Sequence, residues 1–189
     1  MTVSLPRAIA SASLLAASML VGSAAMADPL SVQATMVPKE QIQLDFKDGS
    51  GHFVLMVRRE GTAAGSGLLD GAQIVEFGRH DIIPGVAGDP SGYLVATKGE
   101  GNVAYIKWTV RAVFLPAKDG KPQINDNGFW EVVSGTGAFK GLKGAGTLHI
   151  KAANPTDRIF ILDGQMVPDR KSTRLNSSHI QKSRMPSSA

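Results

Sequence analysis

The sequence predicts an all-β protein, an eight-stranded antiparallel β-barrel, with a β-sandwich as the alternative fold. Of its 21 glycines, 20 lie in residues 28–168, where their spacing leaves no room for a long helical pattern. The same region holds short runs of β-branched and aromatic residues bounded by Gly, Asp, Asn and Pro. The run Ala104–Leu115 also alternates between two faces, which is typical of a strand with one side buried.

Eight runs predict strands, and two of the connections between them predict hairpins. Lys47–Gly49 joins the first and second strands, and Lys98–Asn102 joins the fourth and fifth. A strand resumes promptly after each of the longer glycine-rich connections, so we expect a single domain over 28–168. The predicted strands are Ile42–Phe46, Phe53–Arg59, Gln73–Phe77, Tyr93–Thr97, Ala104–Leu115, Phe129–Val133, Gly146–Lys151 and Arg158–Gly164.

The fifth strand has one wholly apolar face. Burying a large apolar side chain stabilises a fold by roughly 1.5–3 kcal/mol, so this face is expected in the core and Trp108 is interpreted as a core anchor rather than a ligand platform. The apolar face carries Ile106, Trp108, Val110, Ala112 and Phe114, and the other face carries Tyr105, Lys107, Thr109, Arg111 and Val113.

The second strand, Phe53–Arg59, is apolar on both faces for several residues. A strand of this kind is covered on two sides. It therefore indicates either a filled barrel with an oligomer contact outside it, or a closely packed sandwich.

Residues 1–27 match a secretory signal peptide. Arg7 supplies the positive charge, Ala8–Val21 the apolar segment, and Ala25–Ala27 the small-residue cleavage site. The apolar segment is shorter than the roughly 20 residues of a membrane-spanning helix, and no later stretch is apolar enough to span a bilayer. We expect cleavage after Ala27 and a soluble periplasmic or secreted product.

Residues 169–189 resemble translated sequencing adapter. Written back as codons, Asp169–His179 matches a common short-read library adapter, and Ser183–Ala189 fits its continuation after an index. The alternative is a basic, disordered tail that binds nucleic acid. We treat the segment as a non-native disordered tail, so the position of the natural C-terminus beyond Pro168 is not given by the sequence.

Without its two ends the chain is close to neutral. Residues 28–168 hold 14 Lys and Arg against 15 Asp and Glu. Binding to nucleic acid through phosphate neutralisation needs clustered basic residues, and here they are scattered, so we expect no nucleic-acid partner. The chain has no cysteine, which excludes disulfides, thiolate nucleophiles and iron–sulfur clusters.

The densest group of titratable residues gives the candidate catalytic residues Glu76, His80 and Asp81. An oriented histidine beside carboxylates can act as a general base, but neighbours on a strand point to opposite faces, so His80 and Asp81 cooperate only if the chain bends. The alternative is a polar strand end before the turn at Pro84. The histidines show no metal-ligand spacing, and we expect neither a metal nor a cofactor.

The candidate ligand-binding residues are Tyr105, Arg111, Trp130 and Glu131. An arginine inside a barrel must be paired, and Glu131 or Glu76 could pair with Arg111 if its face lines the lumen; the alternative is a solvated face. Phe129 and Trp130 lie on opposite faces of one strand, so at most one of them lines a pocket.

The segment Ser134–Leu148 resembles the "GTGxFxGxxGxG" segment of the allene oxide cyclase and dirigent-like barrels. It holds Gly135-Thr136-Gly137-Ala138-Phe139-Lys140-Gly141 and then Gly144 and Gly146. The motif predicts a glycine-rich corner with positive φ, an apolar plug at Phe139, and a strand leaving from Gly144. The resemblance implies a small eight-stranded barrel, allene oxide cyclase- or lipocalin-like, that is commonly trimeric.

Four functions are compatible with these patterns. The leading hypothesis is an exported barrel that binds one small apolar molecule without covalent chemistry. The resemblance adds an isomerase or cyclase similar to allene oxide cyclase, with Glu76 steering the substrate, and dirigent-like guidance of radical coupling; the fourth is an envelope protein that makes protein contacts. A binder predicts an apolar lumen, an enzyme two converging titratable groups of perturbed acidity, and an interaction protein a filled lumen with an exposed apolar patch.

Overall fold

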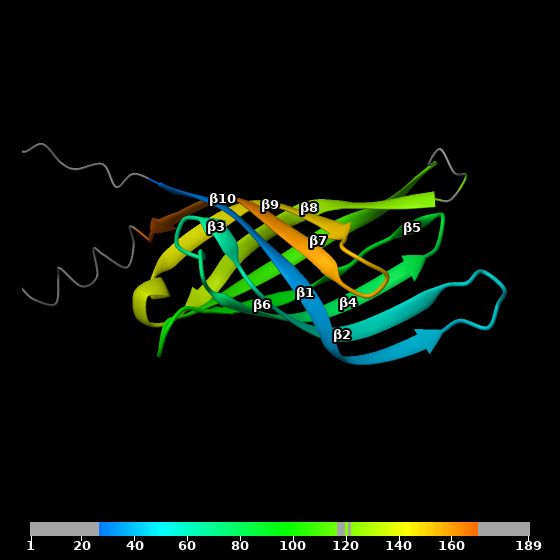
Figure 1. The fold of residues 1–189 in the computed structure, drawn as a ribbon, viewed down its shortest axis with the longest axis horizontal. Coiled ribbons are helices and arrows are strands. Elements are labelled where there is room, and N and C mark those ends of the chain that lie inside the picture. Colours follow the sequence, from blue (N-terminus) through cyan, green and yellow to red (C-terminus); the bar gives the residue numbers. More distant parts are fainter. Residues whose placement is uncertain (1–26, 117–119, 121, 170–189) are drawn as a thin grey trace, which may run out of the picture.

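A computed structural model describes residues 27–116, 120 and 122–169. The predicted signal peptide and the predicted adapter-derived tail lie outside these residues, except for Ala27 and Asp169. The strands are β1 (Asp28–Asp45), β2 (Phe53–Thr62), β3 (Ala64–Ser66), β4 (Gln73–Ile83), β5 (Ala87–Gly88), β6 (Ser91–Thr97), β7 (Val103–Pro116), β8 (Pro122–Gly135), β9 (Leu142–Ala152) and β10 (Arg158–Pro168), and a 3-10 turn, η1, spans Gly137–Phe139 (Figure 1).

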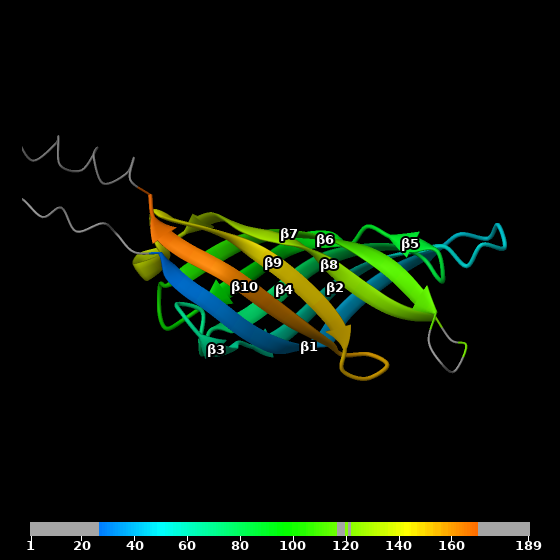
Figure 2. The same ribbon diagram turned by 90° about the horizontal axis from the view of Figure 1, so that it is seen from above.

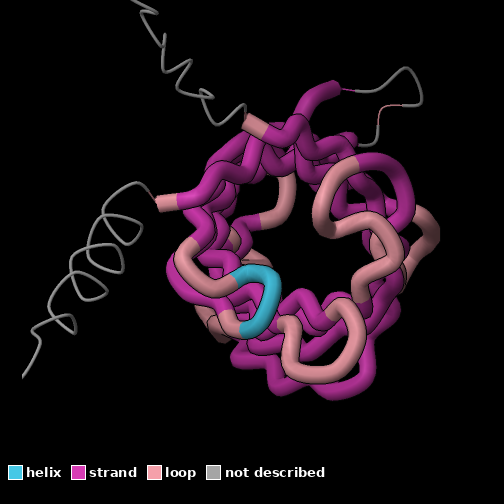
Figure 3. Tube along the Cα trace, turned by 90° about the vertical axis from the view of Figure 1, so that its left-hand side faces the viewer, coloured by secondary structure: helices cyan, strands magenta, loops and turns pink. Residues whose placement is uncertain are grey.

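The strands form a closed antiparallel barrel. Eight long strands pair in the order β1, β2, β4, β6, β7, β8, β9 and β10, and β10 pairs back with β1. The short β3 and β5 continue the edges of β2 and β6. Figure 2 shows β1 and β10 side by side along the closing seam, and Figure 3 shows the ring of strands end-on. The barrel is confirmed, and the sandwich alternative is wrong.

Each predicted strand falls on one of the eight long strands of the barrel, although Ile42–Phe46 runs one residue beyond the end of β1 at Asp45. The largest difference is in β1, which begins at Asp28 rather than at Ile42. Its first half alternates Leu30, Val32, Ala34 and Met36, all buried, with exposed polar residues. Because polar residues separate these four and Pro38 follows them, the sequence prediction did not extend the strand back to Asp28.

The lumen holds the hydrophobic core, and β7 shows how it is built. Ile106, Trp108, Val110 and Ala112 are buried, whereas the alternate side chains of the same strand are exposed. The Trp108 ring lies edge-on to Phe160 of β10, with 5.8 Å between ring centroids. The predicted orientation of β7 and the core role of Trp108 are confirmed.

The corner after β8 matches the expected glycine motif. Gly137 and Gly141 adopt positive φ, 54° and 70°, and Phe139 of η1 is buried at this end of the barrel. The next strand, β9, begins at Leu142, two residues before the expected Gly144. The corner therefore plugs the barrel end that faces the viewer in Figure 3.

The outer face of β2 is open in the single chain. Met56 is 51% exposed, and on the neighbouring strands Ile42 is 77% and Phe77 53% exposed. The apolar outer face noted in the sequence is thus covered by nothing within residues 27–116, 120 and 122–169. In the part of the chain that the structure describes, no helix is long and apolar enough to cross a membrane.

Candidate functional site

The lumen face of β4 carries a glutamate and a histidine in contact. Glu76 is fully buried, and its Oε1 lies 3.1 Å from Nε2 of His80. The residue between them on this face is Gly78, where a Cβ would lie 2.3 Å from Glu76 Oε1 and 2.9 Å from His80 Nε2. Only glycine leaves room for the contact, because any larger side chain would occupy the space between the two groups.

Arg59 of β2 completes this part of the cluster. Its Nη1 donates to Glu76 Oε2 at 2.8 Å and lies 3.1 Å from His80 Nε2. A guanidinium only donates hydrogen bonds, so Nε2 accepts from Arg59 when it is unprotonated and donates to Glu76 when it carries a proton. The two contacts of His80 are therefore alternatives, and the tautomer of its ring selects between them.

A second acid–base pair enters the lumen from β8 and β10. Asp126 is 5% exposed, and its Oδ1 has no hydrogen-bond partner among the described residues. Burial raises the pKa of Asp126 to about 6, and the charge of Arg158 opposes that rise. Burial, together with the charge of Arg59, lowers the pKa of Arg158, whose Nη1 donates to the carbonyls of the 154–157 turn.

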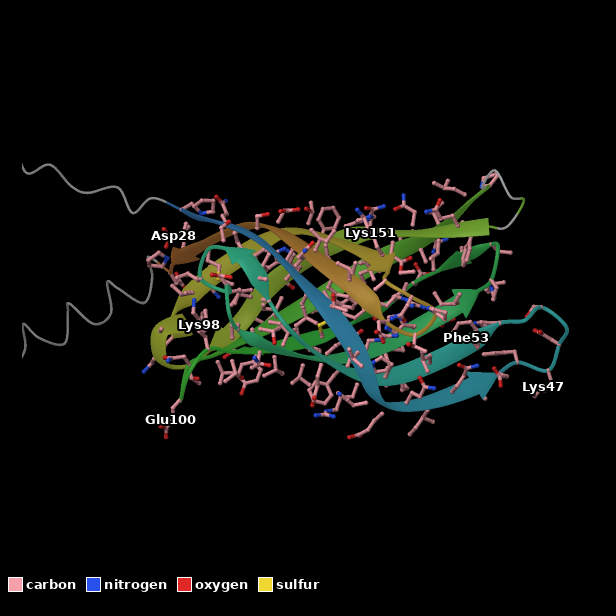
Figure 4. All side chains as sticks on the ribbon, viewed as in Figure 1. Asp28, Lys47, Phe53, Lys98, Glu100 and Lys151 are labelled. Atoms are coloured by element: carbon pink, nitrogen blue, oxygen red, sulfur yellow. The ribbon has the colours of Figure 1, made fainter. Side chains whose placement is uncertain are left out.

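These groups surround a cavity of about 280 Å³ at the barrel end opposite η1. The cavity is walled mainly by apolar side chains, and its polar lining comes from Arg59, His80, Asp126 and Arg158. Figure 4 labels Phe53, which lies at this end and belongs to the wall. The apolar wall consists of Phe53, Leu55, Ile82, Pro84, Phe114, Ile124 and Ile150.

The core beyond the polar cluster is packed with aromatic side chains. The Trp108 ring lies 5.8 Å from the His80 ring, centroid to centroid, and Trp108, Trp130 and Phe160 are almost fully buried. The cavity is therefore a cup at one end of the barrel, with His80 in its lining and Trp108 packed beside the His80 ring.

The three candidate catalytic residues divide between the two sides of β4. Glu76 and His80 point into the lumen, and His80 lines the cavity. Asp81 lies on the outside, where its carboxylate contacts His52 Nε2 at 2.6 Å and Arg79 Nη1 at 3.0 Å. The hydrogen bond from His52 is the main reason that the pKa of Asp81 is lowered. No bend brings His80 and Asp81 together.

None of the four candidate ligand-binding residues lines this cavity. Tyr105, Arg111 and Glu131 are on the outer face, where Arg111 donates to exposed Asp89 at 2.6 Å. Trp130 is buried in the core, and its Nε1 donates to the Asp163 carbonyl at 3.3 Å. Of the alternatives left open for Arg111, the structure has the solvated one.

Sequence reasoning missed Arg59, Asp126 and Arg158. Each continues the buried alternation of its own strand, Arg59 after Val57, Asp126 before Trp130, and Arg158 before Phe160. The predicted strand at Phe129–Val133 began too late to include Asp126, which was assigned to a loop. Following each alternation outwards by two or four residues would have placed all three in the lumen.

Among the described residues, no three His, Asp or Glu side chains gather closely enough to hold a metal ion.

No protein-family model and no curated protein matches the chain. Among solved structures, the chain is similar to a pterocarpan synthase dirigent protein, with a TM-score of 0.48 and 14% identity over 84% of this chain and 99% of that chain. It is also similar to a conserved protein of unknown function from Rhodopseudomonas palustris, with a TM-score of 0.43 and 13% identity over 73% and 97% of the two chains. Likenesses this low carry no argument about this chain, so the barrel rests on its own strand pairing.

Proposed function

We propose that the cavity binds one small, largely apolar molecule that carries a hydroxyl or carboxylic acid group. The observation that carries this proposal is an apolar cup of about 280 Å³ with unpartnered polar atoms in its lining residues. Ligand sites in proteins commonly combine apolar walls with a few polar groups that fix orientation.

The unpartnered atoms define the polar group of the ligand. Arg59 Nε is a donor and Asp126 Oδ1 is an acceptor, and neither has a hydrogen-bond partner among the described residues. A buried polar atom without a partner costs about 1–3 kcal/mol, which a ligand that bonds to it recovers. A hydroxyl or a protonated carboxyl both accepts and donates, and so can bond to either atom.

Equilibrium dialysis with 2-naphthol, and with naphthalene as the matched probe without a hydroxyl, tests this proposal. We expect 2-naphthol to bind at least about tenfold more tightly, as one hydrogen bond to a charged group provides. Leu55→Trp fills the cup and should abolish binding, whereas Tyr105→Trp adds the same side chain outside and should not. Equal binding of 2-naphthol to both variants, or no binding to the parent, would contradict the proposal.

A second candidate function, proton-transfer catalysis, is favoured by the raised pKa of Asp126. A carboxyl with a pKa of about 6 is present in both forms near neutral pH, so it can donate a proton to a bound molecule and take one back. An isomerisation in which Asp126 gives one proton to the bound molecule and takes another back leaves the protein unchanged. Glu76 is less suited to the steering role considered from the sequence, because both of its oxygens are engaged with Arg59 and His80.

We also propose that the barrel acts outside the cytoplasm, on the support of the signal-peptide pattern in residues 1–27. Mass spectrometry of the chain recovered from the periplasm or medium of an expressing bacterium tests this. A mature chain that starts at Asp28 is the expected result, and an unprocessed chain retained in the cytoplasm would contradict it.

A further inference from the structure

The far half of β1 has an unpaired edge. Residues 28–36 of β1 pair with β10 on one side, while Val37–Asp45 pair with β2 on the other. Beyond Met36, no described strand pairs with the edge that faces β10, because β10 begins at Arg158 opposite Met36. Figure 1 shows this part of β1 and β2 as an arm along one side of the barrel, where β1 is the free edge and β2 lies between β1 and β4.

The unpaired edge is solvent-exposed and carries Ile42 and Leu44 between charged and amide side chains. Every residue from Lys39 to Asp45 is exposed, including Ile42 at 77% and Leu44 at 61%. An exposed, unpaired strand edge is a ready template for another strand. This edge indicates that the arm is completed by a partner.

We propose that the partner is a second copy of this chain, whose β1 edge pairs antiparallel with this one around a two-fold axis through Ile42. The inference is independent of ligand binding. In an antiparallel pair, residues directly opposite each other point to the same side of the sheet. A two-fold axis between two copies of one strand therefore lies where a residue faces the same residue of the other copy. With the axis at Ile42, the exposed segment Lys39–Asp45 of one copy pairs along its whole length with the same segment of the other copy.

The charges along the segment select this register. With the axis at Ile42, Lys39 of each copy lies opposite Asp45 of the other, which makes two opposite-charge pairs, and such pairs stabilise a sheet. Moving the axis to Gln43 places Lys39 opposite Lys47, and moving it to Gln41 removes the pairing with Asp45. The axis at Ile42 therefore combines full overlap with matched charges.

The same register joins the apolar surfaces of the two copies. Ile42 faces Met56 on the outer side of the arm, and with Phe77 of β4 they form an exposed apolar strip. A groove of about 470 Å³ lies beside these three side chains. Pairing at Ile42 brings the two strips onto one side of a continuous sheet, so that apolar area flanking the axis is removed from water.

Charge exchange tests the register. Sedimentation velocity of the full chain, expressed with its own N-terminus, should show a concentration-dependent dimer. Lys39→Asp and Asp45→Lys should each weaken it at least tenfold by creating like-charge pairs, and Lys39→Asp combined with Asp45→Lys should restore it to within about threefold of the parent. Both positions are exposed, and circular dichroism checks that the three variants fold.

A cysteine cross-link tests the axis itself. The parent chain has no cysteine, so Ile42→Cys introduces one thiol that meets its own copy across the axis and should form a disulfide-linked dimer under mild oxidation. Val86→Cys, at an equally exposed position in the turn between β4 and β5, is the control and should remain monomeric in denaturing gels. A monomer at all concentrations, a trimer, or a dimer insensitive to the charge changes would overturn the proposal.

Discussion

Asp126 links the chemistry of the cavity to the stability of the fold. Its pKa rises from 3.8 to about 6 because burial disfavours the ionised form. Well below pH 3.8 the carboxyl is protonated in both the folded and the unfolded chain, so the stability of the fold does not change with pH through this group. Between about pH 4 and 6 the unfolded chain loses the proton first, and the fold is destabilised by roughly 3 kcal/mol in total as pH rises.

Asp126→Asn should remove this pH dependence, because the amide does not ionise. We expect the variant to gain stability relative to the parent as pH rises from 4 to 7, by up to roughly 3 kcal/mol. Urea unfolding at several pH values measures the difference, with Asp89→Asn at an exposed carboxyl as the control. A difference between parent and variant that stays constant over this pH range would contradict the expectation.

Gly78 is the residue that permits the Glu76–His80 contact, and Gly78→Ala tests it. We expect a loss of about 1–3 kcal/mol, because the new Cβ would displace a buried carboxylate from its partners. A double-mutant cycle with Glu76→Ala, followed by urea unfolding, measures the coupling. In the Glu76→Ala background, Gly78→Ala should lower the free energy of unfolding by clearly less. An unchanged loss would show that the new Cβ clashes with a group other than Glu76.

At the scale of the strand, alternation along β7 decides which side chains stabilise the barrel. Trp108→Ala should cost about 3–5 kcal/mol, because it leaves a cavity next to Phe160. Thr109→Ala, the next residue and on the outer face, should change the stability by less than about 0.5 kcal/mol. Thermal or urea unfolding of the two variants compares them, and similar losses would contradict the assigned faces.

Local patterns predicted the strands well where β-branched and aromatic residues are dense, as in β7. In β1 the inward residues alternate with Ser31, Gln33 and Thr35, and a strand-forming run was recognised only from Ile42. In β8 the residues before Phe129 are Asp, Asn and Gly, which are also typical turn residues. Pairing with β7 and β9 on either side turns that segment into strand despite its local preference.

At the scale of the molecule, closure between β1 and β10 makes the barrel a single cooperative unit. Val32 pairs with Leu162 on one side and with Gly65 on the other, so its backbone lies between two strands. Val32→Pro should cost about 3 kcal/mol or more beyond the loss in Val32→Ala, because proline cannot donate to a ladder. A single urea transition shifted to lower midpoint is expected, and equal losses in the two variants would contradict it.

The sequence by itself determined the all-β class, the eight strands and which side chains of β7 face the core, because alternation is a property of neighbouring residues in one strand. It also singled out Glu76 and His80 as candidate catalytic residues. Only the tertiary structure decided that Arg59, Asp126 and Arg158 join them. These groups come from strands far apart in the chain, and closure of the barrel and the register of each pair bring their lumen faces to one height. No local pattern contains that information.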